Sequence, residues 1–418
     1  MAVNAPSARC RFCGNPLQDL FVDLGMSPLC ESFLSADQLD RPEVFYPLYV
    51  FVCRECFLVQ LQEYVSPDQI FKDYAYFSSY SDSWLRHAEQ YTETVARRLS
   101  LDGDSFVVEI ASNDGYLLKN FVARSIPCLG IEPAANVAEA ARERGVQSHV
   151  AFFGRNTAGE VRAQHRAADL IVGNNVLAHV PDINDFVAGL CILLAADGAV
   201  TMEFPHLLRL IEGNQFDTIY HEHFSYLSLL TTRRIFEQHG LEIFDVEELP
   251  SHGGSLRVWA QRSGGARRRA GSVEDLIRRE QAAGLESLAT YAGFPERVER
   301  TKRRLLSFLI RARDDGKTVA GYGAPGKGNT LLNYCGIRSD LLEYTVDRNP
   351  FKHGKFCPGT RIPIHPPAHL DATRPDFVLI LPWNLEREIT RQLAHVSQWG
   401  GRFVVPIPEL REYEPAAK

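Results

Sequence analysis

The chain has 418 residues, more than a single hydrophobic core usually holds, so we expect two or three domains. Hydrophobic residues make up 45% of the sequence and charged residues 23%, which excludes a disordered protein. The net charge of −7 argues against a nucleic-acid-binding protein, which needs a basic field over at least one domain. The sequence has no apolar run of about 18 residues and no signal-peptide pattern, so we expect a cytoplasmic protein that does not span a membrane.

The N-terminal segment, to about residue 70, is rich in cysteine, proline and aromatic residues and predicts a small β-rich module. It contains two CxxC pairs, Cys10/Cys13 and Cys53/Cys56, which are separated by 39 residues. Each pair forms a tight knuckle, and four thiolates at this spacing suit one tetrahedral Zn²⁺ ion. Because a four-cysteine site has no open coordination position, we expect the zinc to be structural and not catalytic.

An α/β domain follows. Apolar positions at helical spacing over Trp84–Leu99 lead into a predicted strand at Phe106–Ile110, and helices and strands then alternate to about residue 260. Further predicted strands are Cys128–Ile131, Asp169–Val172 and Ala199–Phe204. This alternation predicts a mostly parallel sheet with helices on both faces, and such sheets bind ligands at the carboxyl ends of their strands.

Polar residues stand at these strand ends. Glu109 ends the first strand, and a turn that contains Gly115 follows it. Glu132 ends the next strand, where its carboxylate can accept hydrogen bonds from both hydroxyls of a ribose. We expect the following residues to contact a cofactor: Glu109, Ala111, Asn113, Gly115, Glu132, Asn174 and Asn175.

The densest group of titratable side chains is Tyr220–Tyr226. If this segment is extended, Tyr220 and Glu222 point one way, and His221 and His223 point the other. Two histidines beside a phenol and a carboxylate are suited to general acid–base catalysis. The alternative is a packed aromatic segment whose histidines bond to the backbone.

A Gly/Arg-rich stretch at Ser263–Gly271 predicts a linker, and a charged helical region then runs over Val273–Arg313. A second α/β unit opens at Thr318–Gly321 and continues through Leu342–Val346 and Phe377–Leu381. The chain therefore contains two Rossmann-like halves.

The second half contains a rival motif. Gly321–Gly326 has the form GxGxxG after a strand, and Asp347 follows about 20 residues later, as in dinucleotide-binding folds. This motif supports an alternative function, an NAD(P)-dependent oxidoreductase acting on a nucleotide sugar. Against it, Pro325 stiffens the turn, and Lys327 and Asn329 offer basic and amide groups that suit a pyrophosphate at a helix N-terminus.

Several segments occur together in an order that resembles the bacterial deoxysugar C-methyltransferases. They are the four cysteines, Tyr74–Ser81, Glu109–Gly115, Asn174–His179, Tyr220–Tyr226 and Gly321–Gly326. The resemblance spans essentially the whole chain. It implies a zinc-binding module, a class I methyltransferase domain that binds S-adenosylmethionine, and a second Rossmann-like domain that contributes to nucleotide-sugar binding, at residues 1–70, 71–262 and 263–418 respectively.

Members of that family methylate C3 of a dTDP-linked 4-keto-deoxyhexose, on routes to the branched sugars of antibiotics and surface polysaccharides. The resemblance implies that His223 is the catalytic base, with Tyr220, Glu222, His179 and Tyr74 beside it; Tyr76 is the alternative to Tyr74. The substrate contacts that we expect are Tyr76, His252, Tyr322, Lys327 and Asn329, although His252 and the glycines after it are equally compatible with an ordinary turn. We expect a monomer, because one chain can build the whole site.

Overall fold

The structure is a computed structural model that describes residues 8–66, 69–70, 79 and 82–414. They form two compact units, and each unit contains several stretches of the chain. The first consists of Met1–Gln18, Cys53–Leu207 and Glu222–Glu286, and the second consists of Asp19–Val52, Leu208–His221 and Ser287–Lys418.

The first unit contains a seven-stranded sheet with the strand order β10-β11-β8-β7-β4-β5-β6. Neighbouring strands are parallel except at β11, which is antiparallel to both of its neighbours. The predicted mostly parallel sheet is therefore confirmed. The strands are β4 (Val107–Ile110), β5 (Cys128–Ile131), β6 (Ser148–His149), β7 (Ala168–Asn174), β8 (Leu194–Pro205), β10 (Leu241–Leu249) and β11 (Ser255–Arg262).

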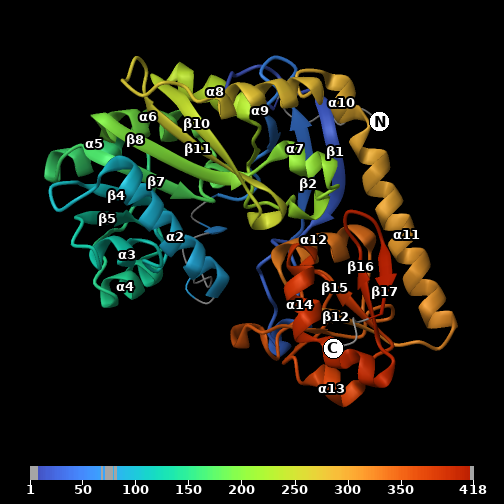
Figure 1. The fold of residues 1–418 in the computed structure, drawn as a ribbon. Helices are drawn as coiled ribbons and strands as arrows, with labels where there is room; N and C mark the ends of the chain where they lie inside the picture. Colours follow the sequence, from blue (N-terminus) through green and yellow to red (C-terminus); the bar gives the residue numbers. More distant parts are fainter. Residues whose placement is uncertain (1–7, 67–68, 71–78, 80–81, 415–418) are drawn as a thin grey trace. The chain divides into compact units, whose positions relative to one another are not determined.

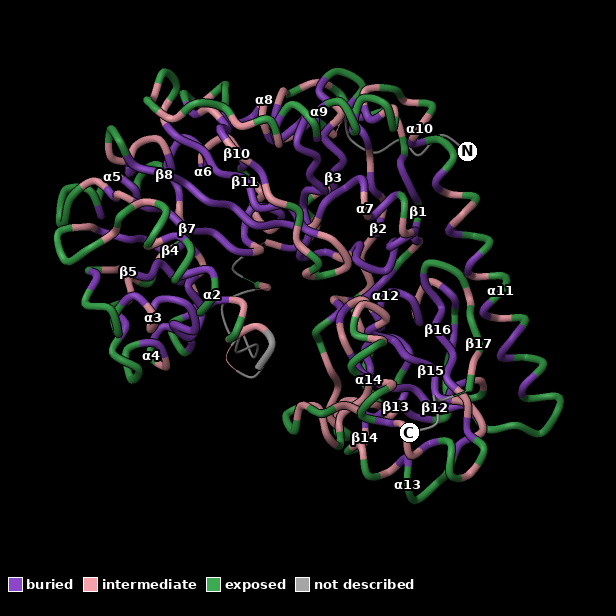
Figure 2. Tube along the Cα trace, viewed as in Figure 1, coloured by how far each residue is buried: buried purple, intermediate pink, exposed green. Residues whose placement is uncertain are grey.

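Helices cover both faces of this sheet. All four residues of β4 are buried, which requires apolar cover on both sides because successive side chains point to opposite faces. Figure 1 shows α2, α3 and α4 along one side and α5, α6 and α8 along the other, and Figure 2 shows the strands between them as buried. The helices are α2 (Asp82–Leu99), α3 (Leu118–Val122), α4 (Ala135–Glu143), α5 (Arg155–Gln164), α6 (Ile183–Leu193), α8 (Leu229–Gln238) and α9 (Gly271–Ala282), with single turns η3 (Leu177–His179) and η5 (Ser251–Gly253).

A short antiparallel ladder belongs to the same unit. Strand β3 (Val59–Leu61) follows the second cysteine pair and pairs with β9 (Ser225–Tyr226). Residues next to the cysteines therefore contact the backbone that directly follows His223.

The second unit contains a six-stranded sheet with the order β14-β13-β12-β15-β16-β17, parallel except at β17. Its strands are β12 (Val319–Tyr322), β13 (Thr345–Val346), β14 (Ile364–His365), β15 (Phe377–Ile380), β16 (Arg402–Val405) and β17 (Arg411–Tyr413). Its helices and turns include α7 (Leu207–Glu212), which begins at the unit boundary, η4 (Phe216–Thr218), α10 (Leu288–Ala292), α11 (Phe294–Asp314), α12 (Gly326–Cys335), α13 (His369–Thr373), η7 (Trp383–Leu385), α14 (Glu386–Gln392) and η8 (Ala394–Trp399).

The residues between the two cysteine pairs pack with the second unit. Strands β1 (Asp19–Ser27) and β2 (Tyr46–Val52) form an antiparallel pair. The ring of Phe21 in β1 stacks on Phe294 at a centroid distance of 4.5 Å, and both rings are buried. Burial of such rings is a strong apolar driving force, which explains why this segment belongs to the C-terminal half of the chain.

The predicted linker at Ser263–Gly271 is wrong. Its Arg267 guanidinium donates hydrogen bonds to the carbonyls of Gly198 (3.0 Å) and Asp197 (2.8 Å), so the stretch is bound to the first unit. The division between the units falls later, between Glu286 and Ser287. Gly/Arg composition alone cannot distinguish a free linker from a loop whose arginines bind carbonyls.

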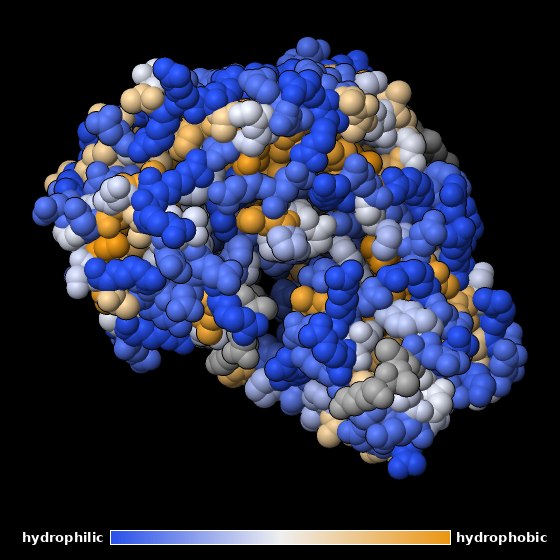
Figure 3. Space-filling view, viewed as in Figure 1, coloured by the Kyte–Doolittle hydropathy of each residue, from blue (hydrophilic) through white to orange (hydrophobic). Residues whose placement is uncertain are grey.

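The face drawn in Figure 3 is mostly hydrophilic, with several apolar areas. Among the helices of the described ranges, none is long and apolar enough to cross a membrane.

Candidate active site and metal centre

The four cysteines come together in the first unit. Their sulfur atoms lie within 4.8 Å of one another, with 3.5 Å between Cys10 and Cys56 and 3.5 Å between Cys13 and Cys53. Four sulfurs at about 2.3 Å from a zinc ion form a tetrahedron with edges of roughly 3.8 Å, so the cluster has the right size. Within the part of the chain that the structure describes, this is the only such group of three or more histidine, cysteine or acidic side chains.

Both cysteine pairs close the same turn. The amide of Gly14 donates to the carbonyl of Cys10 (2.9 Å), and the amide of Phe57 donates to the carbonyl of Cys53 (2.8 Å). Gly14 and Phe57 have positive φ angles of 75° and 60°. The backbone itself therefore brings the two thiols of each pair together, as a zinc knuckle requires.

The turn after β4 is tight, and its sequence is unusual for such a turn. Ala111, Asn113 and Gly115 have φ angles of 56°, 50° and 75°, so three residues are left-handed where a glycine-rich loop is common. Glycine is required at the last of them, because a Cβ on Gly115 would lie 2.9 Å from Cγ2 of Val146. The left-handed Ala111 carried no signal in the sequence.

The two predicted acidic residues at this edge differ in their partners. Glu109 is 1% exposed, and burial, followed by repulsion from Glu132 and Asp114, raises its pKa well above the ordinary value. Burial also raises the pKa of Glu132, although its two oxygens accept the amides of Asn113 and Ala134, both at 2.9 Å. Glu132 thus holds the turn closed as well as lying at the position predicted for a ribose contact.

Two neighbouring asparagines stand at the end of β7. Asn174 is 8% exposed, and its side chain interacts with the buried phenol of Tyr116, as does the carboxylate of Glu109. No other described group bonds to the side-chain atoms of Asn174 or Glu109. Buried polar groups normally have partners, so this edge fits a polar cofactor that supplies them. Asn175 bonds through Nδ2 to Nε2 of His252 (3.1 Å), which joins a predicted cofactor residue to a predicted substrate residue.

A buried ion network that the sequence did not indicate lies on the same sheet. The carboxylate of Glu203 in β8 accepts hydrogen bonds from Arg257 (2.7 Å) and Ser251 (2.7 Å), and lies 2.9 Å from Nε2 of His87. Burial alone would raise the pKa of Glu203, but these bonds and charges outweigh it and lower the pKa to about 2. Ser251 precedes His252, whose φ is 55°, so Glu203 anchors the turn that presents His252.

His179 and His223 form a pair. Their rings meet edge to face with centroids 4.7 Å apart, and the amide of Phe224 donates to the carbonyl of Ala178 at 2.8 Å. Burial lowers the pKa of His179 to about 4, despite a hydrogen bond to the backbone of Glu222, so its imidazole is neutral at neutral pH. The structure thus brings together two of the predicted catalytic residues.

The predicted alternation of side chains along Tyr220–His223 does not occur, because His221 and Glu222 form a turn. Nε2 of His221 bonds to the carbonyl of Pro47 (3.2 Å), and its ring lies 5.7 Å from that of Tyr46. Burial lowers the pKa of His221. This histidine matches the alternative reading of a packed residue bonded to the backbone.

Of the three tyrosines predicted for the site, two lie outside the described residues, Tyr74 and Tyr76. Tyr220 belongs to the second unit, since the division falls between His221 and Glu222. Their roles stay predictions.

A polar cluster in the second unit surrounds the predicted substrate residue Lys327. Its Nζ donates to the side-chain oxygen of Asn384 (2.8 Å) and lies 4.8 Å from the ring centroid of Trp383. Nε1 of Trp383 donates to the carboxylate of Asp217 at 2.7 Å. Burial raises the pKa of Asp217 to about 6 and lowers the pKa of Lys327. The opposite charges of the two groups offset part of the free energy that it costs to bury each of them.

The other two predicted substrate residues of this unit have internal partners. Nδ2 of Asn329 donates to the carbonyl of Cys30 (2.6 Å), and Asn329 is 1% exposed. The hydroxyl of Tyr322 donates to Gln392 at 3.5 Å. Of the three, Lys327 has the arrangement best suited to a ligand.

Helix α12 begins at Gly326, so the GxGxxG segment does form a strand–turn–helix. However, the helix N-terminus carries an anion from the chain itself, because the Gly326 amide bonds to the carboxylate of Glu31. Lys352 lies 3.5 Å from the same carboxylate. Asp347, expected at the ribose of a dinucleotide, accepts the amide of Ala324 at 2.7 Å.

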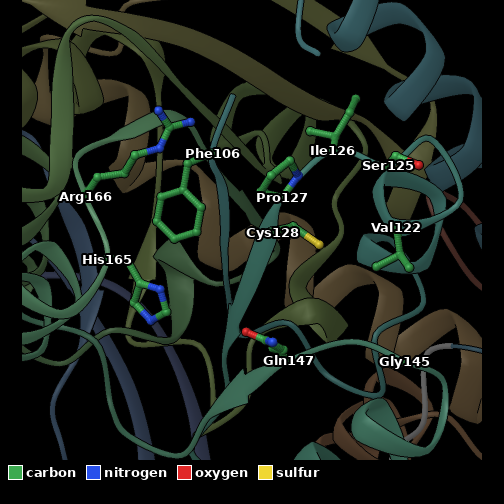
Figure 4. Close-up of a pocket in the computed structure, with 10 residues that line it drawn as sticks. All are labelled: Phe106, Val122, Ser125, Ile126, Pro127, Cys128, Gly145, Gln147, His165 and Arg166. Atoms are coloured by element: carbon green, nitrogen blue, oxygen red, sulfur yellow. The ribbon is translucent and has the colours of Figure 1, made fainter. Parts of the chain in front are cut away.

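A cavity of about 550 Å³ lies at the opposite edge of the first sheet (Figure 4). It is formed at the amino ends of β4 and β5, whereas ligands of such sheets bind at the carboxyl ends. It is therefore not the predicted cofactor site. Its lining residues are Phe106, Val122, Ser125, Ile126, Pro127, Cys128, Gly145, Gln147, His165 and Arg166.

Comparison with known proteins matches almost the whole chain. The family model of a putative zinc binding domain matches residues 10–71, that of a methyltransferase domain matches residues 83–246, and that of a C-methyltransferase C-terminal domain matches residues 250–408. The C-methyltransferase NovU of Streptomyces niveus is 37% identical over 406 residues, which cover 97% of each protein.

Solved structures resemble a smaller part of the chain. An S-adenosylmethionine-dependent methyltransferase from Clostridium acetobutylicum has a TM-score of 0.35 at 10% identity and covers 43% of this chain and 92% of its own. Magnesium protoporphyrin IX methyltransferase from Synechocystis has a TM-score of 0.33 at 15% identity, over 47% of this chain and 89% of its own. Similarities this low support no inference about function.

Proposed function

Because the chain belongs to the S-adenosylmethionine-dependent C-methyltransferases that carry a zinc-binding domain, we propose that it methylates C3 of a dTDP-linked 4-keto-deoxyhexose. The observation that carries this proposal is the pair of His179 and His223, which meet at 4.7 Å. His179 is four residues beyond Asn175, at the edge where the cofactor residues stand. A base is thus available beside the cofactor edge.

The chemistry that we propose begins at the ketone. The C4 carbonyl acidifies the C3 hydrogen, and His223 takes that proton while the C3–H electron pair forms an enolate. The nucleophilic C3 then bonds to the methyl carbon, the methyl–sulfur bond breaks, and its electron pair stays on the sulfur of S-adenosylhomocysteine. A general base contributes about 10² to 10⁴-fold.

The other predicted catalytic residues act on the oxyanion and on the base. A neutral imidazole at His179 can donate a hydrogen bond to the enolate oxygen, and so can the phenol of Tyr74, Tyr76 or Tyr220. Such a donor contributes about 10² to 10³-fold. Glu222 adjoins His223 in the chain, and we propose that it orients the base.

S-adenosylmethionine supplies the electrophilic methyl group when bound. We propose that Glu109 and Asn174, whose only partner among the described residues is the phenol of Tyr116, bind its amino acid portion. Glu132 suits the ribose, as predicted. Val150 and Phe152 follow the neighbouring strand β6 and are 42% and 44% exposed, so they offer an apolar surface for the adenine that the sequence did not indicate.

For the nucleotide part of the sugar we propose the second unit. Lys327 offers a cation beside the indole of Trp383, which suits a diphosphate next to a pyrimidine. When no nucleotide is bound, the carboxylate of Asp217 compensates the buried positive charge of Lys327. His252 is a further candidate for contact with the sugar, through the turn that Glu203 anchors.

The alternative, an NAD(P)-dependent oxidoreductase using the GxGxxG segment, is less well supported. A dinucleotide needs the N-terminus of α12 for its pyrophosphate. Here the carboxylate of Glu31 already bonds to the Gly326 amide at that N-terminus. The protein is therefore not expected to bind NAD through this motif.

The test is mass spectrometry of a dTDP-4-keto-2,6-dideoxyhexose incubated with enzyme and S-adenosylmethionine. Wild type should add one methyl group, and His223→Ala should lower the rate by at least about 10²-fold, with unchanged S-adenosylmethionine affinity. His221→Gln is the matched control and should remain within about threefold of wild type, because His221 bonds to the backbone.

Two results would count against the proposal. If His223→Ala kept most of the activity, another residue would be the base. If wild type bound S-adenosylmethionine but left the sugar unchanged, the C-methyltransferase activity would stand and the proposed sugar would be wrong.

A further inference from the structure

Arg11 lies inside the first cysteine knuckle, yet its side chain reaches the segments that carry the active-site histidines. Its Nη1 donates to the carbonyl of Pro181 at 2.6 Å, and its Nη2 donates to the carbonyl of Leu61. The guanidinium carbon also lies 5.4 Å from the ring centroid of Phe224. Pro181 is two residues after His179, and Phe224 directly follows His223.

These contacts complete a set of hydrogen bonds around the histidine pair. The amide of Leu61 in β3 donates to the carbonyl of Phe224 at 3.0 Å, and the amide of Phe224 donates to the carbonyl of Ala178 at 2.8 Å. One bond therefore ties β3 to the His223 segment, and the other ties that segment to the His179 segment. The guanidinium of Arg11 extends from the zinc knuckle and contacts the same three segments.

The backbone of Arg11 is itself fixed by the metal centre. Its amide donates to Oε1 of Gln60 (2.8 Å), and Nε2 of Gln60 donates to the sulfur of Cys10 (3.1 Å). Nδ2 of Asn184 donates to the carbonyls of Arg11 (3.0 Å) and Phe12 (2.9 Å). A knuckle held by zinc thus determines where the guanidinium sits.

An arginine suits this position for two reasons. Its rigid fork of donors can serve carbonyls on two separate segments at once, which the single ammonium of a lysine does less well. In addition, four thiolates around one divalent ion form a net negative centre, which favours a cation nearby.

We propose that Arg11 is a positioning residue that fixes the separation of His179 and His223 and thereby couples the zinc knuckle to methyl transfer. This inference rests on the proposed function, because it assigns both histidines to the active site. If Arg11 has this role, the zinc module positions the active-site histidines in addition to stabilising the fold.

The pKa of His179 provides a readout other than activity. Burial lowers that pKa to about 4, and the nearby His252 lowers it further, while the bond to the backbone of Glu222 raises it. His223 also faces this imidazole, edge to face at a centroid distance of 4.7 Å. If the segment after η3 moves outward, water reaches the ring and the pKa rises toward the ordinary histidine value.

The experiment compares Arg11→Met and Arg11→Lys with wild type as full-length zinc proteins. Zinc content and S-adenosylmethionine affinity should be unchanged in both. With Met, kcat should fall about 10 to 100-fold and KM less than threefold, because a displacement of about 1 Å costs up to 10²-fold. Imidazole resonances in ¹³C-histidine NMR, assigned with His179→Gln and His223→Gln, should show a raised pKa for His179. Arg11→Lys should lie between Met and wild type.

The matched control is Arg9→Met, which removes an exposed arginine of the same knuckle that bonds only locally, to the carbonyl of Gly14 at 3.0 Å. It should match wild type in every measurement. The inference is overturned if Arg11→Met leaves kcat and the titration of both histidines as in wild type, or if zinc is lost together with activity in both Arg11 variants. Should wild type fail to methylate the sugar, the proposed function fails, while the NMR comparison still decides the role of Arg11.

Discussion

The two α/β sheets of this protein both carry acidic residues at the carboxyl ends of their strands, but the chain satisfies these residues to different extents. Glu109, at the end of β4, has only the phenol of Tyr116 as a partner among the described residues, and burial raises its pKa. Asp347, after β13, accepts the amides of Ala324 (2.7 Å) and Asn349 (2.8 Å). A strand, a turn and a carboxylate are thus not enough to identify a cofactor site.

The same contrast holds for the helices that follow. The N-terminus of α12 is already bonded to the carboxylate of Glu31, whereas Glu109 and Asn174 at the edge of the first sheet interact only with Tyr116 among the described residues. The two edges therefore differ in how far the chain satisfies the polar groups that stand there.

Removal of zinc should have the largest effect of the three changes, and it should destabilise the first unit much more than the second. All four cysteines belong to the first unit, and a structural zinc ion contributes about 10 kcal/mol in small zinc domains. We expect Cys53→Ser to lose zinc and to raise amide exchange in β3 and β9, with β12, β15 and β16 still protected. Hydrogen-exchange mass spectrometry checks this, with Cys128→Ser, a thiol outside the cluster, as the control. Equal loss of protection in both sheets would contradict it.

Replacement of Glu109 by glutamine should weaken binding and stabilise the empty protein. Loss of a charged partner lowers S-adenosylmethionine affinity about 10 to 100-fold. The folded pKa is raised above the ordinary 4.5, so wild type loses stability as the pH rises from about that value to the folded pKa, because the carboxyl ionises in the unfolded chain while it stays protonated in the folded one. Glutamine has no such loss. The difference in unfolding temperature should therefore grow with pH and then level off, which thermal scans between about pH 4 and 8 can measure. A pH-independent difference would show that Glu109 is not desolvated.

Replacement of Asp347 by asparagine should have the smallest effect of the three changes. In contrast to the replacement of Glu109, it should lower the stability of the protein and leave ligand binding unchanged. Asparagine keeps one acceptor oxygen, so one of the two backbone amides loses its partner, at a cost of about 1 to 2 kcal/mol. S-adenosylmethionine affinity should stay as in wild type. Urea unfolding and a ligand titration measure the two quantities. A threefold or larger loss of affinity would mean that the second sheet contributes to cofactor binding.

Much of the fold was predictable because burial leaves a periodic trace in the sequence. The strands at Cys128–Ile131 and Phe377–Ile380 were expected within a residue, since they are short apolar runs between helical segments. The four cysteines were equally clear, because the knuckle is local and its spacing is specific. The turn at His221 and Glu222 was not, because a dense run of aromatic and charged residues has no period.

The site was predictable in its residue types and not in its partners. His179 and His223 were both expected, whereas the network of Glu203, Arg257 and His87 was not, because its members lie far apart in the chain and each looks ordinary there. Arg11 gave no signal either, since a basic residue between two cysteines is unremarkable until its acceptors are known.

The sequence by itself determined the two parallel sheets, the metal ligands and the chemical groups available at the strand ends, since these depend on local spacing and burial. Only the tertiary structure decided which of those groups bond to the chain and which are left for a ligand. The physical reason is that a hydrogen-bond partner is chosen among all segments brought within about 3 Å, and that choice is made by packing over hundreds of residues.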